Sequence, residues 1–119
     1  MRLFLTVLFS LAGLSLAQAH AFLDHAEPKV GSTLTASPSV VKAWYTEELE
    51  PAFSKIQVFD STGKEIDNKD VKVDSADKSL MSVSVPTALP AGAYKVKWSA
   101  VAVDTHHTTG TFTFTVTSP

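Results

Sequence analysis

Residues 93–116 read AYKVKWSAVAVDTHHTTGTFTFTV, and polar and apolar side chains alternate along most of this stretch. In residues 111–116 (TFTFTV) every second residue is large and apolar. Residues 93–103 repeat this pattern at Tyr94, Val96, Trp98 and Ala100. Residues two apart in a strand point to the same face of the sheet, so the alternation predicts two strands, each with one buried face.

Five further segments carry strand signals and are separated by turn residues: 21–24, 40–47, 53–59, 71–73 and 80–85. No stretch after the first 19 residues has a convincing helical period. Seven short antiparallel strands in about 100 residues predict an all-β fold, a seven-stranded immunoglobulin-like Greek-key sandwich or barrel. Four aromatic residues are expected in its core: Trp44, Trp98, Phe112 and Phe114.

The first 19 residues form a separate region. Arg2 precedes an apolar run over residues 3–16 (LFLTVLFSLAGLSL), and Ala17-Gln18-Ala19 supplies the small residues that signal peptidase requires. The run is shorter than the roughly 20 residues that span a bilayer. Residues 1–19 are therefore predicted to be a signal peptide cleaved after Ala19, rather than a retained anchor, which leaves residues 20–119 as one exported domain.

Charge and cysteine content exclude several classes of function. Ten basic residues stand against twelve acidic ones, for a net charge of −2. Without Arg2, nine lysines and the same twelve acidic residues give −3. The exported domain has no arginine and no basic run, so no nucleic-acid partner is expected. The chain has no cysteine, which excludes disulfides and thiolate metal sites.

The four histidines lie near the two ends of the exported domain: His20, His25, His106 and His107. Cleavage after Ala19 makes His20 the first residue, so its amine and its imidazole Nδ1 can chelate one metal ion. In an extended segment Asp104 and His106 point to one side and His107 to the other. If the fold brings His20 beside them, one amine, two imidazoles and one carboxylate meet. Cu(II) prefers such a tetragonal set of nitrogen and oxygen donors.

Four segments also carry a resemblance to a known family: residues 19–23 (AHAFL), 26–32 (AEPKVGS), 45–47 (YTE) and 91–114 (AGAYKVKWSAVAVDTHHTTGTFTF). On these residues the chain resembles the CopC family of bacterial periplasmic copper-binding proteins. The resemblance covers essentially the whole exported domain. It implies a periplasmic Cu(II)-binding protein, not an enzyme, that serves copper sequestration, delivery or resistance. An inner-membrane copper transporter of the CopD type is the partner that it implies.

The same resemblance implies three residues that bind Cu(II): His20, Asp104 and His106. It also implies that the carboxylate of Glu47 supports these ligands without binding the metal. Two positions depart from the family pattern. His25 stands where a small hydroxyl residue is usual, and His107 stands where a proline is usual. Both departures add an imidazole near the expected site, and whether either joins it is open at this point.

Two alternative functions remain open. The chain could be a copper mono-oxygenase whose terminal histidine braces the metal, or an immunoglobulin-like interaction module without metal.

Met81 is the only methionine of the exported domain, so a thioether cluster for Cu(I) is not expected. The expected state of the protein is a monomer.

Overall fold

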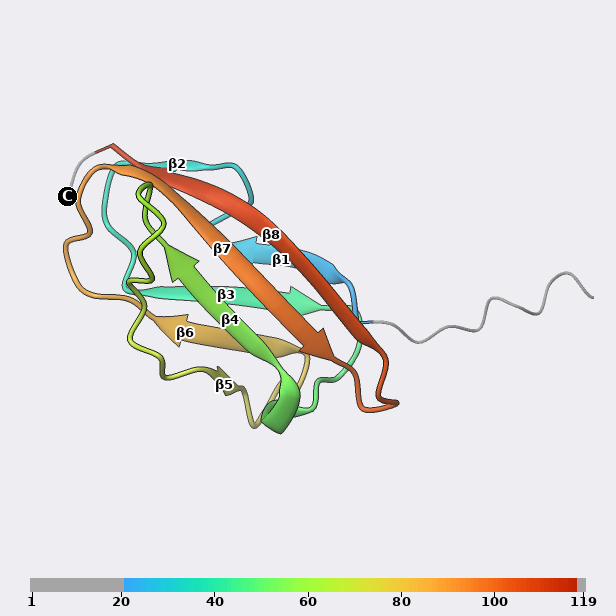
Figure 1. Ribbon diagram of the computed structural model, residues 1–119. Coiled ribbons are helices and arrows are strands. Elements are labelled where there is room, and N and C mark those ends of the chain that lie inside the picture. Colours follow the sequence, from blue (N-terminus) through green and yellow to red (C-terminus); the bar gives the residue numbers. More distant parts are fainter. Residues whose placement is uncertain (1–20, 118–119) are drawn as a thin grey trace, which may run out of the picture.

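The computed structural model describes residues 21–117, which form a sandwich of two four-stranded sheets (Figure 1). The predicted signal peptide and His20 lie outside the described residues. The first sheet has the order β1 (Leu23–Glu27), β3 (Val40–Tyr45), β6 (Leu80–Ser84) and β5 (Lys72–Val73). The second has the order β2 (Thr33–Leu34), β8 (His107–Val116), β7 (Gly92–Val101) and β4 (Lys55–Phe59). A 3₁₀ turn, η2 (Pro51–Phe53), precedes β4.

The predicted immunoglobulin-like fold class is confirmed. Without β2, the strands are ordered as in the two sheets of an immunoglobulin domain, four in one and three in the other. The short strand β2 was not predicted, and it pairs with β8 in parallel whereas the other neighbours are antiparallel. Two residues are too few for alternation to reveal a strand. Among residues 21–117, no helix is long and apolar enough to cross a membrane.

The longest ladder pairs β7 with β8, and it forms much of the core. The inward positions of β7 are buried, as the alternation predicts: Tyr94, Val96, Trp98 and Ala100. Trp98 pairs with Gly110, and its indole occupies the place of a side chain there. A Cβ added at Gly110 would lie 2.5 Å from Cζ2 of Trp98, so this position accepts only glycine without a shift of the ring.

The start of β7 is fixed by a tyrosine corner. The Tyr94 hydroxyl donates a hydrogen bond of 2.6 Å to the backbone carbonyl of Pro90, four residues upstream. Immunoglobulin-like sandwiches use this contact where the chain passes from one sheet to the other. Its ring also stacks on Phe114, with 5.4 Å between ring centroids.

One predicted core residue, Trp44, lies elsewhere. In β3 the inward positions are Val41, Ala43 and Tyr45, which are buried. Trp44 has the opposite parity, so it is half-buried on the outer face, where it stacks on His25. The prediction that Trp44 belongs to the core is wrong, because alternation within a strand sends neighbouring aromatic residues to opposite faces.

The parallel contact between β2 and β8 ties an early segment to the last strand. The N–H of Thr115 donates to the carbonyl of Ser32 at 2.9 Å, and the N–H of Thr117 donates to that of Leu34 at 2.9 Å. The N–H of Gly31 donates back to the carbonyl of Thr113 at 2.7 Å. These hydrogen bonds hold the segment before β3 against the C-terminal half of β8.

Candidate metal centre

The start of the described chain is fastened at one end of the sandwich. Ala21 is buried, and its carbonyl accepts a hydrogen bond of 2.6 Å from the Thr108 hydroxyl. The Phe22 N–H donates to Oγ1 of Thr46 at 3.0 Å, and the Phe22 carbonyl accepts from the Thr46 N–H at 2.9 Å. The chain here is therefore held between the beginning of β8 and the loop that follows β3.

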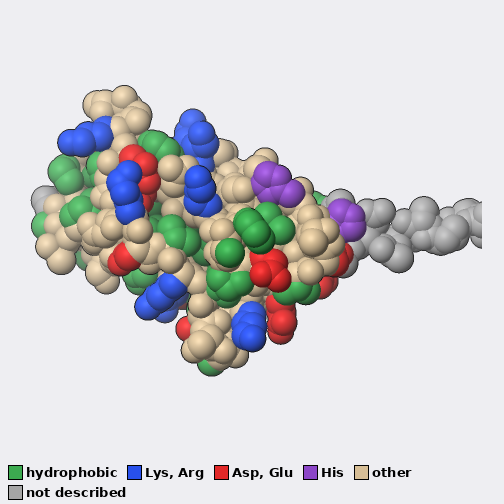
Figure 2. Space-filling view, turned by 60° about the horizontal axis from the view of Figure 1, so that its bottom comes forward, with side chains coloured by type: hydrophobic (Ala, Val, Ile, Leu, Met, Phe, Trp, Pro, Cys, Tyr) green, Lys and Arg blue, Asp and Glu red, His purple; other side chains and the backbone are tan. Residues whose placement is uncertain are grey.

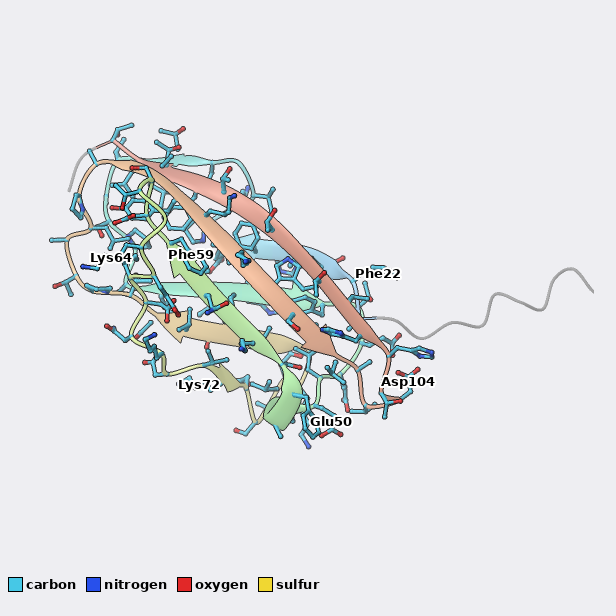
Figure 3. All side chains as sticks on the ribbon, in the orientation of Figure 1. Phe22, Glu50, Phe59, Lys64, Lys72 and Asp104 are labelled. Atoms are coloured by element: carbon cyan, nitrogen blue, oxygen red, sulfur yellow. The ribbon has the colours of Figure 1, made fainter. Side chains whose placement is uncertain are left out.

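That loop also runs beside the turn between β7 and β8. The Val103 N–H donates to the Glu48 carbonyl at 3.1 Å, and the Glu50 N–H donates to the Val101 carbonyl at 2.8 Å. Figure 3 shows Glu50 and Asp104 at the same end of the sandwich. The end that holds Asp104 is therefore rich in carboxylates, which favour a nearby cation.

The turn between β7 and β8 is tight and not extended. The Thr105 N–H donates to the Ala102 carbonyl at 2.7 Å, and the Ala102 N–H donates to the His106 carbonyl at 3.0 Å. Thr105 has a φ of 76°, which a β-branched residue seldom adopts. The prediction of an extended segment over 104–106 is wrong, because β7 and β8 are antiparallel neighbours and the chain must reverse between them.

Asp104 and His106 nevertheless meet. Oδ2 of Asp104 lies 3.1 Å from Nδ1 of His106, and Oδ1 accepts the His106 N–H at 3.2 Å. These contacts with His106 hold the pKa of the Asp104 carboxyl below its usual value, so Asp104 is ionised at neutral pH. The side chains are 36% and 52% exposed.

The separation within this pair suits a metal ion. Nitrogen and oxygen ligands lie about 2.0–2.2 Å from a transition metal such as zinc. Two ligands at right angles around the metal are then about 3 Å apart. The 3.1 Å between Oδ2 of Asp104 and Nδ1 of His106 matches two neighbouring positions around one ion.

None of the other predicted site residues within the described chain forms a hydrogen bond or ion pair with Asp104 or His106. Glu47 is exposed next to Thr46, and within residues 21–117 its carboxylate forms no hydrogen bond or ion pair. Nε2 of His107 lies 2.7 Å from the Ser99 hydroxyl on the outer face of β7 and β8. His25 stacks on Trp44, on the outer face of the first sheet.

No three metal-binding side chains (His, Cys, Asp or Glu) gather closely enough to hold an ion within the described residues 21–117. Those residues contribute two donors to the predicted centre, Asp104 and His106. The predicted third ligand, His20, lies outside the described residues.

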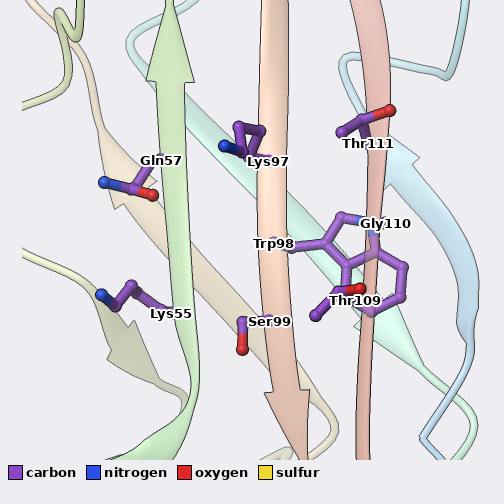
Figure 4. Close-up of a pocket in the computed structure, with 8 residues that line it drawn as sticks. All are labelled: Lys55, Gln57, Lys97, Trp98, Ser99, Thr109, Gly110 and Thr111. Carbon is purple, nitrogen blue, oxygen red and sulfur yellow. The ribbon is translucent and has the colours of Figure 1, made fainter.

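A hollow of about 430 Å³ on the outer face of β4, β7 and β8 has a different chemistry (Figure 4). Its lining consists of Lys55, Gln57, Lys97, Trp98, Ser99, Thr109, Gly110 and Thr111. Two ammonium groups without a carboxylate repel a cation, so this hollow is no metal centre. In Figure 2, the histidines in view and several acidic side chains lie toward the right-hand side, while other acidic side chains lie further left.

Two anchoring residues escaped sequence reasoning. Thr108 and Thr46 hold the start of the described chain. The sequence singles out Thr46 only as the middle residue of 45–47, one of the segments that resemble the CopC family. Thr108 lies among five threonines of β8, at positions 108, 109, 111, 113 and 115, and nothing in their pattern distinguishes it. The bond to Ala21 joins residues 87 apart, so local sequence gives no signal for it.

Comparison with known proteins gives a consistent result. A family model described as the CopC domain matches residues 23–117. The chain is 34% identical over 107 residues to copper resistance protein C of Pseudomonas syringae pv. tomato, a match that covers 86% of this chain and 84% of that protein. It is 29% identical over 98 residues to copper transport protein CutJ of Bacillus subtilis. That match covers 82% of this chain but only 18% of CutJ.

A solved structure agrees in fold. The crystal structure of CopC from Methylosinus trichosporium OB3b superimposes with a TM-score of 0.77 at 33% sequence identity. The match covers 83% of this chain and 95% of that one.

Proposed function

Because this chain belongs to the CopC family of copper-resistance and copper-transport proteins, we propose that it binds Cu(II) as cargo for sequestration, delivery or resistance. Members of this family bind copper and are not enzymes, so the mono-oxygenase alternative is set aside. The observation that carries the proposal is the Asp104–His106 pair, whose donor atoms lie 3.1 Å apart beside the anchored start of the domain.

We assign the remaining donors to His20. The Thr108 hydroxyl holds the Ala21 carbonyl, and Thr108 is two residues from His106. One peptide bond, with about 3.8 Å between Cα atoms, joins His20 to Ala21. After cleavage at Ala19, the amine and imidazole of His20 complete a set of three nitrogens and one carboxylate oxygen.

Cu(II) is the oxidation state that these donors fit. Imidazole, amine and carboxylate suit Cu(II), whereas Cu(I) prefers sulfur. The chain has no cysteine, and the one methionine of the described residues, Met81, is fully buried in the core. The carboxylate of Asp104 offsets part of the charge of Cu(II). Glu47, in the loop beside it, is proposed to support the ligands without binding copper.

The cellular setting follows from the same proposal. A signal peptide over residues 1–19 delivers a monomer to the periplasm. CutJ, in which the matching region is a small part of a longer chain, is named a copper transport protein. This supports a partner of the inner-membrane CopD type, to which a separate CopC chain passes its copper.

Mass spectrometry of the exported protein, combined with a Cu(II) titration, tests this proposal. We expect an N-terminus at His20 and tight binding of one Cu(II) by the protein. A variant with one extra residue before His20 keeps the fold but loses the free amine of the chelate. We expect it to bind this copper much more weakly.

Two results would contradict the proposal. Unchanged affinity in the extended variant would remove the amine from the ligand set. A folded, correctly processed protein without Cu(II) affinity would favour the metal-free interaction module.

A further inference from the structure

A β-bulge in β1 places two neighbouring side chains on the same exposed surface. Leu23 pairs with Tyr45 and His25 pairs with Trp44, so two steps along β1 correspond to one step along β3. Consecutive strand residues normally point to opposite faces, and a bulge suspends this rule for the extra residue. Asp24 and His25 are consequently both exposed, at 61% and 58%.

The two side chains already form a pair. Oδ2 of Asp24 lies 2.7 Å from Nδ1 of His25. The imidazole also stacks on Trp44, with 4.4 Å between ring centroids and 8° between ring planes. The stack orients the ring without using its nitrogens. Part of the entropy that a free surface histidine loses on binding a metal is therefore already lost.

We propose that Asp24 and His25 form a second, weaker Cu(II) site, separate from the site at Asp104 and His106. One carboxylate oxygen and one imidazole nitrogen at this separation fit neighbouring positions around one ion, with water in the others. Among divalent first-row metals, such nitrogen and oxygen donors bind Cu(II) most strongly.

The surroundings of the pair supply no third ligand. It borders a shallow hollow of about 300 Å³ that is also lined by Glu27 and Lys29. Glu27 is not near enough to make a group of three donors, because no such group exists within residues 21–117. Two protein donors therefore hold the ion loosely, so that copper exchanges readily.

An auxiliary role for this site in accepting or releasing copper rests on the proposed function. A loosely held ion on the outer face of β1 and β3 can pass to a stronger donor set by ligand exchange. His107 offers no such site, because its Nε2 contacts the Ser99 hydroxyl and not a carboxylate. It therefore serves as a matched control among the exposed histidines.

The test is a Cu(II) titration of the exported protein, followed by electron paramagnetic resonance and by tryptophan fluorescence. We expect a second, weaker Cu(II) equivalent that quenches Trp44. In His25→Phe an aromatic ring can still stack on Trp44 but the donor is lost, so the second equivalent should disappear. Asp24→Asn should weaken it by at least about 10-fold, because losing even a carboxylate that only supports a metal-binding histidine costs about 10- to 100-fold. His107→Ala should leave it unchanged.

The outcomes separate this proposal from the proposed function. A second equivalent that persists in His25→Phe, or that disappears in His107→Ala, overturns the second site. A protein that binds one Cu(II), lost in His106→Ala but kept in His25→Phe, also overturns it and leaves the proposed function intact. A protein that binds one Cu(II), lost in His25→Phe but kept in His106→Ala, supports the second site and contradicts the proposed function.

Discussion

Two aspartate–histidine pairs lie on this molecule, and the backbone assembles each in a different way. Asp104 and His106 are two residues apart and meet across a tight turn in which Thr105 has a positive φ. Asp24 and His25 are adjacent and meet because of a bulge. The second pair follows the anchored Phe22 by two residues, whereas the first lies two residues from Thr108, whose hydroxyl holds the Ala21 carbonyl. We propose that His20 joins the first pair alone, and we attribute the expected difference in Cu(II) affinity to this third residue.

We expect the largest loss of Cu(II) affinity when one imidazole of the first pair is removed. His106→Ala should weaken the tight Cu(II) equivalent by more than about 100-fold, because loss of only the outer partner of a ligand already costs about 10- to 100-fold. A chelator competition would measure the affinity, and electron paramagnetic resonance would count the nitrogens. His107→Ala should be nearly silent. If both variants change the spectrum equally, the assignment of His106 is wrong.

Reduction of Cu(II) to Cu(I) should release copper from both pairs. Neither contains sulfur, and Met81 is fully buried, so Cu(I) finds no soft donor on the described surface. We expect ascorbate to release copper from both sites to a Cu(I) chelator. Retention of Cu(I) against a strong chelator would contradict the assignment of both sites.

The anchoring contact should matter for one pair alone. Thr108→Val removes the hydroxyl that holds the Ala21 carbonyl at 2.6 Å, while Thr108→Ser retains a hydroxyl. A single hydrogen bond contributes about 1 kcal/mol, so the tight equivalent should weaken by about tenfold or less in the valine variant. The weaker equivalent should not change. Equal titrations of the valine and serine variants would show that the anchor does not position the third donor.

The smallest expected effect is a change in the pKa of Asp104 in the metal-free protein. The side-chain hydrogen bond with His106 holds the pKa of Asp104 below its usual value, so His106→Ala should raise that pKa toward the ordinary carboxyl value. A depressed carboxyl pKa stabilises the fold above the unfolded-state value, and this contribution is lost as pH falls through the folded value. An NMR titration of the Asp104 carboxyl carbon would measure the change. An unchanged pKa would mean that the two side chains are not paired in the free protein.

Alternation along strands was the part of the structure that sequence could predict. Tyr94, Val96 and Trp98 occupy the buried face as expected, because each stands at an inward position of a regular strand. The same rule fails where a strand is irregular or where the parity is misjudged. The aromatic character of Trp44 predicts a core position, but the buried neighbour Tyr45 has the inward parity.

Most of the candidate centre depends on contacts between distant residues. The meeting of Asp104 with His106 was expected, but from an extended segment, whereas a turn brings the two together. The bulge beside His25 follows from pairing with β3, and the anchor at Ala21 follows from packing against β8. Such pairings depend on tertiary structure, and no short motif within either segment encodes them.

The parallel pairing of β2 with β8 has a mechanical consequence. Because the two strands run in the same direction, tension between the chain ends pulls β2 and β8 in opposite senses along their length. The hydrogen bonds of Thr115 and Thr117 to the earlier segment then share the load instead of breaking one at a time. Forced unfolding is governed by the unfolding rate, so we expect this short parallel pairing to slow unfolding of the domain when its ends are pulled.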